Sequence, residues 1–190
     1  MIFNGEMVRA ILDGGKTQTR RPVKVPHIDK DAMCELSGNE LAGELLAGNY
    51  RNSPHGKPGD RIWVRETWAR YNIDQDSHDM AYRATPPADW PEEGRWRPSI
   101  HMPRWASRLM LEITGVRVER LQAITLGDIC KEIGCGLYDF RPATYGFQVW
   151  EELWKSIYGE ENWQANPWVW VIEFKVVPNV PANSTGSDLR

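Results

Sequence analysis

The 190-residue chain lacks any long hydrophobic run that could cross a membrane. No apolar stretch approaches the roughly 20 residues that a bilayer span needs, and the N-terminus has no signal-peptide pattern. We therefore expect a cytoplasmic protein without membrane contact. The apolar fraction of 41% is typical of globular proteins, and the chain is long enough to bury a hydrophobic core.

Cysteine and histidine are also scarce. The three cysteines form neither an even set nor a Cys-x-x-Cys pair, which favours reduced structural thiols over a metal or redox site. The four histidines stand far apart without helical ligand spacing, which argues against zinc. Neither a P-loop nor a Rossmann glycine fingerprint is present. We expect no metal and no other cofactor.

Charge is slightly negative overall, at −3, but it is unevenly distributed. Residues 16–24 and 95–108 each carry four basic side chains and no acid, and the second stretch also contains Trp96 and Trp105. Arginine beside tryptophan suits phosphate contact combined with base stacking. The alternative is that these arginines pair with acids from other segments. The residues that we expect to contact nucleic acid are Arg20, Arg21, Arg97, Arg104, Trp105 and Arg108.

Periodicity and turn signals predict a mixture of short helices and strands. Helices are expected between Asn4 and Gly14, over 126–133 and over 145–158, with a further candidate over 36–46. Strands are expected over 17–21, 61–68, 80–84, 109–118 with a bulge at Gly115, and 168–177. The last strand is nearly apolar at first and should be central. These elements predict an α+β fold, a small, mixed, mostly antiparallel β-barrel with about three packed helices.

Ten tryptophans are unusually many for this length. Those at periodic positions of the expected elements are more typical of a core than of a ligand platform. These core candidates are Trp63, Trp150, Trp154, Trp168 and Trp170. Trp96 and Trp105, within the basic stretch, are the better candidates for stacking on bases.

The stretch Gly14–Arg21 concentrates an amine, two hydroxyls and two guanidinium groups after a glycine pair. A threonine hydroxyl becomes a nucleophile when a base takes its proton, and a buried lysine can be that base. Lys16 and Thr19 would need a carboxylate to orient the amine, and Glu132 or Glu66 could supply it. The alternative is that Lys16 and Thr19 only bind phosphate.

Gly14-x-Lys16-x-x-Thr19-x-Arg21 resembles the signature of the ASCH domain family, whose fold is similar to that of the PUA domain. In most of that family the position of Thr19 is a glutamate, and threonine is the pattern of the bacterial N4-acetylcytidine amidohydrolases. The resemblance implies one PUA-like barrel over 1–177, with inserted loops near 23–58 and 85–108 and a flexible tail over 178–190. In these insertions the chain is similar to ASCH proteins of phages and prophages.

The resemblance also implies a partner and an activity. RNA or a modified nucleoside would be the partner. A metal-independent amidohydrolase would remove the acyl group of an N4-acetylcytidine-type substrate, with Lys16 as base, Thr19 as nucleophile and Glu132 as the supporting acid. Two alternatives remain: a non-catalytic RNA-binding module, and an ASCH-type ribonuclease that uses Lys16 and an acid for proton transfer.

Overall fold

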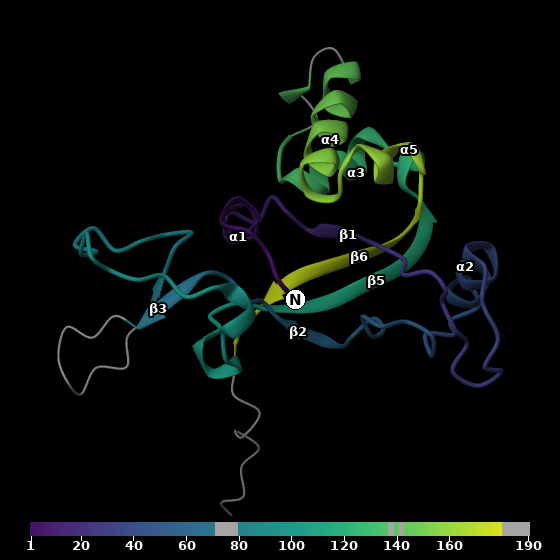
Figure 1. Ribbon diagram of the computed structural model, residues 1–190, viewed down its shortest axis with the longest axis horizontal. Coiled ribbons are helices and arrows are strands. Elements are labelled where there is room, and N and C mark those ends of the chain that lie inside the picture. Colours follow the sequence, from purple (N-terminus) through teal and green to yellow (C-terminus); the bar gives the residue numbers. More distant parts are fainter. Residues whose placement is uncertain (71–79, 137–138, 141–142, 180–190) are drawn as a thin grey trace, which may run out of the picture.

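The computed structural model describes residues 1–70, 80–136, 139–140 and 143–179 of the chain (Figure 1). The α-helices within these ranges are α1 (Gly5–Leu12), α2 (Gly38–Leu46), α3 (Leu126–Ile133), α4 (Ala143–Tyr158) and α5 (Glu160–Gln164). The strands are β1 (Gln18–Pro22), β2 (Arg61–Trp63), β3 (Trp68–Arg70), β4 (Met80–Tyr82), β5 (Met110–Arg120) and β6 (Trp168–Val177). Short 3₁₀ helices lie at Ser99–His101, Arg104–Ala106 and Leu121–Ala123.

A curled antiparallel sheet forms the centre of the molecule (Figure 1). Its strands are ordered β1, β6, β5, β2, and each neighbouring pair is antiparallel. In the described part of the chain β1 and β2 stay at open edges, so the sheet is a half-barrel rather than a closed barrel. The predicted bulge is confirmed, because the register between β5 and β6 shifts between Ile113 and Gly115.

The last strand is central, as predicted. β6 pairs with β1 on one side and with β5 on the other. Its residues 169–172 are buried, because α-helices cover both faces of the sheet at this point. Five α-helices are present among the described residues, more than the expected three, since α2 and the short α5 also form.

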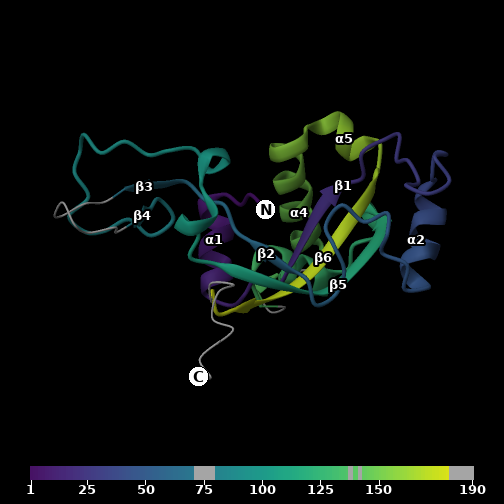
Figure 2. The same cartoon turned by 90° about the horizontal axis from the view of Figure 1, so that it is seen from below.

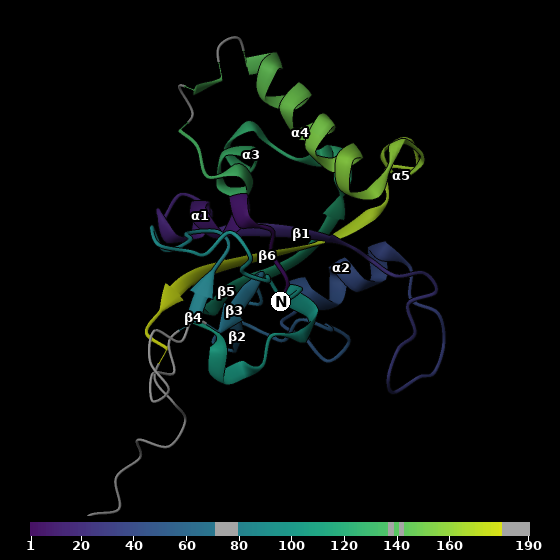
Figure 3. The ribbon, with the colours of Figure 1, turned by 60° about the vertical axis from the view of Figure 1, so that its left-hand side comes forward.

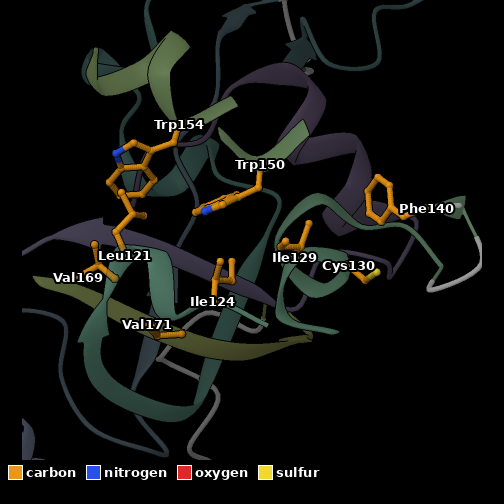
Figure 4. Close-up of a cluster of buried hydrophobic side chains, with 9 residues drawn as sticks. All are labelled: Leu121, Ile124, Ile129, Cys130, Phe140, Trp150, Trp154, Val169 and Val171. Atoms are coloured by element: carbon orange, nitrogen blue, oxygen red, sulfur yellow. The ribbon is translucent and has the colours of Figure 1, made fainter. Parts of the chain in front are cut away.

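Two apolar layers cover the opposite faces of the sheet. On one face, Val169 and Val171 of β6 pack with Trp150 of α4 and with α3 (Figure 4). The alternate residues Trp170 and Ile172 pack on the other face, toward α2. Figure 3 shows α2 lying across the sheet from α4. Alternation along β6 therefore divides the core into two layers.

The tryptophan content is explained mostly by this core. Of the five tryptophans expected there, Trp150, Trp154 and Trp170 are buried. Trp63 and Trp168 are only half-buried, because both lie at the rim of the sheet.

Side-chain caps define the first turns of the helices. Asn4 Oδ1 accepts a hydrogen bond from the Met7 N–H at 2.8 Å and starts α1 where the sequence predicts it. Ser37 and Glu40 form a complete capping box at the start of α2. Thr125 caps α3 by accepting from the N–H of Asp128. These local signals made the helix starts predictable.

The expected strand over 61–68 is wrong as a single element. The chain leaves the sheet after β2, because Arg65 pairs with the N-terminal segment: its N–H donates to the Met1 carbonyl and its carbonyl accepts from the Phe3 N–H. It then forms a separate two-stranded sheet, β3 with β4. This second sheet and the 85–108 segment form a lobe at the end of the main sheet opposite α2 (Figure 2).

Candidate functional site

The glycine-rich segment before β1 lies against the C-terminal ends of two helices. The N–H of Lys16 donates to the Ala10 carbonyl of α1 at 2.9 Å, and the N–H of Thr17 donates to the Lys131 carbonyl of α3 at 3.0 Å. Carbonyls in the last turn of a helix have no partner within the helix. The segment therefore donates hydrogen bonds to free carbonyls at the ends of both helices, and it joins these helices to β1 at the edge of the sheet.

Glycine is required where this segment touches α3. A Cβ atom added to Gly15 would lie 2.6 Å from the carbonyl oxygen of Gly134. Gly134 ends α3 with a φ of +90°, a conformation that side chains rarely adopt. Two glycines in contact thus set how closely β1 approaches the helix that carries Glu132.

The Lys16 side chain is buried and reaches the last turn of α3. Its Nζ donates to the backbone carbonyl of Glu132 and lies 3.4 Å from Oε1 of the same residue. Burial lowers the pKa of the Lys16 ammonium, while the nearby Glu132 carboxylate opposes this shift. The structure therefore brings together the lysine and the glutamate that the sequence singled out.

Glu132 is shared with a second cation, Arg20. Its Oε1 accepts from the backbone N–H of Arg20 at 3.0 Å, and its Oε2 lies 3.5 Å from Nη1 of the same arginine. The Arg20 guanidinium also contacts Glu119 at 2.5 Å and Asp128 at 3.6 Å. With its side chain fully buried among three carboxylates, Arg20 cannot contact nucleic acid in this structure, contrary to the sequence-based expectation.

Thr19 does not join Lys16 and Glu132. In β1 it pairs with Ile172, so its side chain lies on the α2 face of the sheet, whereas Arg20 faces α3. Its hydroxyl is fully buried and has no hydrogen-bond partner. Glu132 Oε2 and Arg20 Nε also lack hydrogen-bond partners. Two of these orphaned atoms, on Arg20 and Glu132, belong to the same ion-pair cluster, whereas the Thr19 hydroxyl lies on the other face of the sheet.

Glu66, the other carboxylate considered for Lys16, is engaged elsewhere. It is buried and forms a two-pronged ion pair with Arg108, with both N–O distances at 2.9 Å. The Arg108 guanidinium also lies 4.1 Å from the ring centroid of Tyr82. Arg108 thus belongs mainly to the interior contacts of the lobe, and Glu66 does not orient Lys16.

A pocket of about 510 Å³ opens beside the end of β1, two residues beyond Thr19. Arg21 lies on the same face of β1 as Thr19 and pairs with Trp170. We call this cavity the Trp170 pocket. Its side chains with rings or charges are Arg21, Lys24, His27, His55, Tyr158 and Trp170. Sequence reasoning identified Arg21 but missed the aromatic wall, whose members come from four separate segments.

The inserted segment near 23–58 builds one side of this pocket. His27 and His55 both approach the Trp170 ring edge-on, with ring centroids 5.7 Å away. Asn52 is buried and holds the two arms of the segment together. Its carbonyl contacts His27 Nε2, and its Oδ1 accepts from the Lys30 N–H. The insertion is therefore a preformed wall of the pocket.

His55 is neutral in this setting. Burial, together with the positive charge of Arg21, lowers its pKa from 6.5 to about 4. A neutral imidazole has one nitrogen that donates and one that accepts a hydrogen bond. The pocket thus presents His55 as an uncharged hydrogen-bonding side chain beside the cationic Arg21.

The basic and aromatic patch expected over 95–108 lies in the lobe, at the end of the main sheet opposite α2 (Figure 2). Trp105 is 61% exposed; its ring lies nearly perpendicular to that of Trp68 with the centroids 6.0 Å apart, and the Arg70 guanidinium lies 5.7 Å from its ring centroid. Arg97 lies 5.4 Å from the ring centroid of Trp68. Arg97 and Arg104 are exposed, so three of the predicted contact residues share one accessible surface.

Trp96, the other expected stacking residue, already has an aromatic neighbour. Its ring stacks on Trp90 with centroids 4.1 Å apart and an interplanar angle of 20°. One face of Trp96 is thus occupied, and Trp105 is the more accessible platform.

Metal sites, cysteine pairs and membrane-spanning helices are the remaining features considered among the described residues. Across 1–70, 80–136, 139–140 and 143–179 no group of three or more histidine, cysteine or acidic side chains could hold a metal ion. Cys34, Cys130 and Cys135 are free thiols. None of the helices within these ranges is long and apolar enough to cross a membrane.

Comparisons with protein-family models, with curated proteins and with solved structures find no match to this chain.

Proposed function

We propose that the protein binds RNA or a modified nucleoside, and that a base enters the Trp170 pocket. The single observation that carries this proposal is the composition of that pocket. A phenol and two imidazoles line it together with Arg21 and Lys24, and the buried indole of Trp170 lies behind the two imidazoles. Aromatic rings contact the faces and edges of bases, and cations attract the phosphates or polar edges attached to them.

The size and placement of the pocket support this use. A volume of about 510 Å³ falls within the range of typical small-molecule sites. The pocket adjoins β1, which contains Thr19 and Arg21 of the ASCH-like signature. The curled antiparallel sheet is compatible with a barrel-like fold, and we propose that the chain is a PUA-like member of the ASCH family.

The test is a binding titration with cytidine, N4-acetylcytidine and a short single-stranded RNA. We expect calorimetry to detect binding of both nucleosides, and His55→Ala to weaken it about tenfold, as expected for one lost hydrogen bond and ring contact. His101→Ala is the matched control, because His101 is exposed and lies in the lobe. Nucleosides that fail to bind, or that bind both variants equally, would contradict the proposal.

A second candidate function is amide hydrolysis, and one observation favours it. The Lys16 pKa is lowered by burial, and the hydroxyl of Thr19, three residues further along the chain, has no hydrogen-bond partner. A neutral Lys16 amine would accept the Thr19 proton as Thr19 Oγ1 attacks the acyl carbon. The cytidine amine then leaves with that proton, and water releases the acid from the acyl-threonine. Because Thr19 is fully covered and its side chain lies on the α2 face of the sheet, this reaction requires β1 to rearrange so that Thr19 Oγ1 becomes accessible and meets the Lys16 amine.

The corresponding assay follows the release of cytidine and acetate from N4-acetylcytidine. Thr19→Val should abolish turnover, since it removes only the hydroxyl oxygen, whereas Thr17→Val is a nearby control at a half-buried position. Turnover that survives Thr19→Val would exclude this mechanism. Shortened RNA strands in a parallel incubation would instead support the ribonuclease alternative.

A further inference from the structure

The inserted segment near 23–58 that builds one side of the Trp170 pocket also lines a second hollow, of about 440 Å³. Two chain segments connect them: one runs from His27 in the pocket to Lys30 in the hollow, and the other from His55 to Lys57. We call the second cavity the Lys57 hollow. A chain of three residues spans at most about 10 Å, so the backbone of Lys30 lies within this distance of His27, and that of Lys57 within it of His55.

Cations dominate the lining of the Lys57 hollow. Lys30, Arg51 and Lys57 line it, against the single carboxylate of Asp60. Arg51 pairs with Asp31 at 2.6 Å, at the exposed rim. The Lys57 ammonium pairs with no carboxylate of the described residues, and Lys30 Nζ donates only to the Arg51 carbonyl at 2.6 Å. Donors therefore remain unused on both lysines.

The backbone of the hollow is fixed around these cations. The Asp60 carboxylate accepts from the Lys57 N–H at 2.9 Å, so it closes the turn beneath Lys57. Gly56 adopts a φ of +94°, and a Cβ there would lie 2.6 Å from Asp60 Oδ2. Asn52 holds the Lys30 backbone from the other side. The positions of the two lysine backbones are thus set before any ligand binds, which lowers the entropic cost of binding an anion.

We propose that the Lys57 hollow binds a phosphate group of the same ligand whose base enters the Trp170 pocket. The inference rests on the proposed function and specifies its substrate class. The ligand would be a phosphorylated nucleotide or a nucleotide within a single strand, rather than a free nucleoside. Lys30 and Lys57 donate to the phosphate oxygens, and Arg51 adds positive charge at the rim.

The test compares calorimetric titrations with cytidine, cytidine 5′-monophosphate, cytidine 3′-monophosphate, a cytidine-containing trinucleotide and inorganic phosphate. We expect at least one phosphorylated ligand to bind the wild-type chain about tenfold more tightly than cytidine. Lys57→Gln should remove most of this advantage while cytidine affinity stays unchanged. Lys175→Gln is the matched control, because Lys175 is an exposed lysine of β6 outside both cavities.

The outcomes separate the possible sources of the phosphate and the two proposals. A gain with the monophosphates supports a free nucleotide, and a gain with the trinucleotide alone supports a strand. Equal affinity for cytidine and all phosphorylated ligands, or equal effects of Lys57→Gln and Lys175→Gln, would overturn the inference. If cytidine itself does not bind, the proposed function fails. In that case binding of inorganic phosphate that is lost in Lys57→Gln would still support an anion site in the Lys57 hollow. If the wild-type chain does not bind phosphate either, the anion site is overturned as well.

Discussion

Lys16 donates to the backbone carbonyl of Glu132 in the last turn of α3 while its Nζ lies 3.4 Å from the Glu132 carboxylate. One lysine thus satisfies the end of a helix and pairs with a side chain of the same residue. Because cations are favoured at helix C-termini, both contacts stabilise the charged amine. Burial opposes them and dominates, so the pKa is lowered.

The lowered Lys16 pKa predicts a rise in stability at alkaline pH. Between its folded pKa and the ordinary value of 10.5, the unfolded chain binds more protons at this site than the folded one. The free energy of unfolding therefore increases with pH in this window, by at most about 1.4 kcal/mol per pH unit for one proton. Urea unfolding from pH 8 to 10.5 should show wild type gaining stability relative to Lys16→Met.

Lys175→Met supplies the control for this comparison, because Lys175 is 59% exposed and pairs only with Glu112. The difference in the free energy of unfolding between wild type and Lys175→Met should not change with pH in the way expected for Lys16→Met. Parallel curves for wild type and Lys16→Met across this range would show that Lys16 titrates as an ordinary lysine.

The contact between Gly15 and Gly134 predicts that alanine at position 15 lowers the free energy of unfolding. Alanine at position 43, where no such contact exists, should not. Gly15→Ala places a methyl group 2.6 Å from the backbone oxygen of Gly134, and backbone cannot move aside cheaply. We expect a loss of about 2 kcal/mol in the free energy of unfolding. Gly43→Ala, on an exposed face of α2 with nothing within 4 Å, should instead stabilise the chain by about 0.5–1 kcal/mol. Chemical denaturation of both variants measures the difference, and equal effects would contradict the close approach.

Sequence patterns predicted the elements whose cause is local. The Asn4 cap, the Thr125 cap and the apolar run of β6 are each visible within a few residues. The break after β2 was not predictable in this way, since it depends on pairing between Arg65 and Ile2, far apart in the chain. Contacts at long sequence separation therefore account for the wrong strand.

In the candidate site, too, contacts between residues far apart in the chain were harder to predict than local features. The sequence indicated Glu132 as a carboxylate for Lys16, and the structure brings the two together. The charge pattern alone could not tell buried from exposed arginines. Arg20 pairs with carboxylates far along the chain, because Glu119 and Glu132 are 99 and 112 residues away. The Trp170 pocket likewise assembles from segments that no single motif connects.

The lowered pKa of His55 predicts how the pocket responds to acid. The folded pKa is about 4 and the ordinary value is 6.5, so the unfolded chain takes up the proton first as pH falls. The stability that His55 contributes is present above about pH 6.5 and is lost between pH 6.5 and 4. An NMR titration of the imidazole should have its midpoint near 4. The stability difference between wild type and His55→Gln should shrink over the same window, and a midpoint near 6.5 would contradict the buried setting.

The exposed ring of Trp105 predicts a second, separable contact with single-stranded RNA. Base stacking on an aromatic side chain is worth about 1–3 kcal/mol, so Trp105→Ala should weaken RNA binding about tenfold while cytidine binding at the Trp170 pocket is unchanged. Phe147→Ala is the matched control, since Phe147 is an exposed aromatic residue on α4, outside the lobe.

Replacing Arg97 or Arg104 with glutamine should reduce the salt dependence of RNA affinity by about one phosphate contact each. Anisotropy titrations at several salt concentrations measure both effects. If Trp105→Ala and Phe147→Ala bind RNA equally well, the lobe is not part of the nucleic-acid interface, and the arginines of 95–108 serve the packing of the lobe, as Arg108 already does with Glu66.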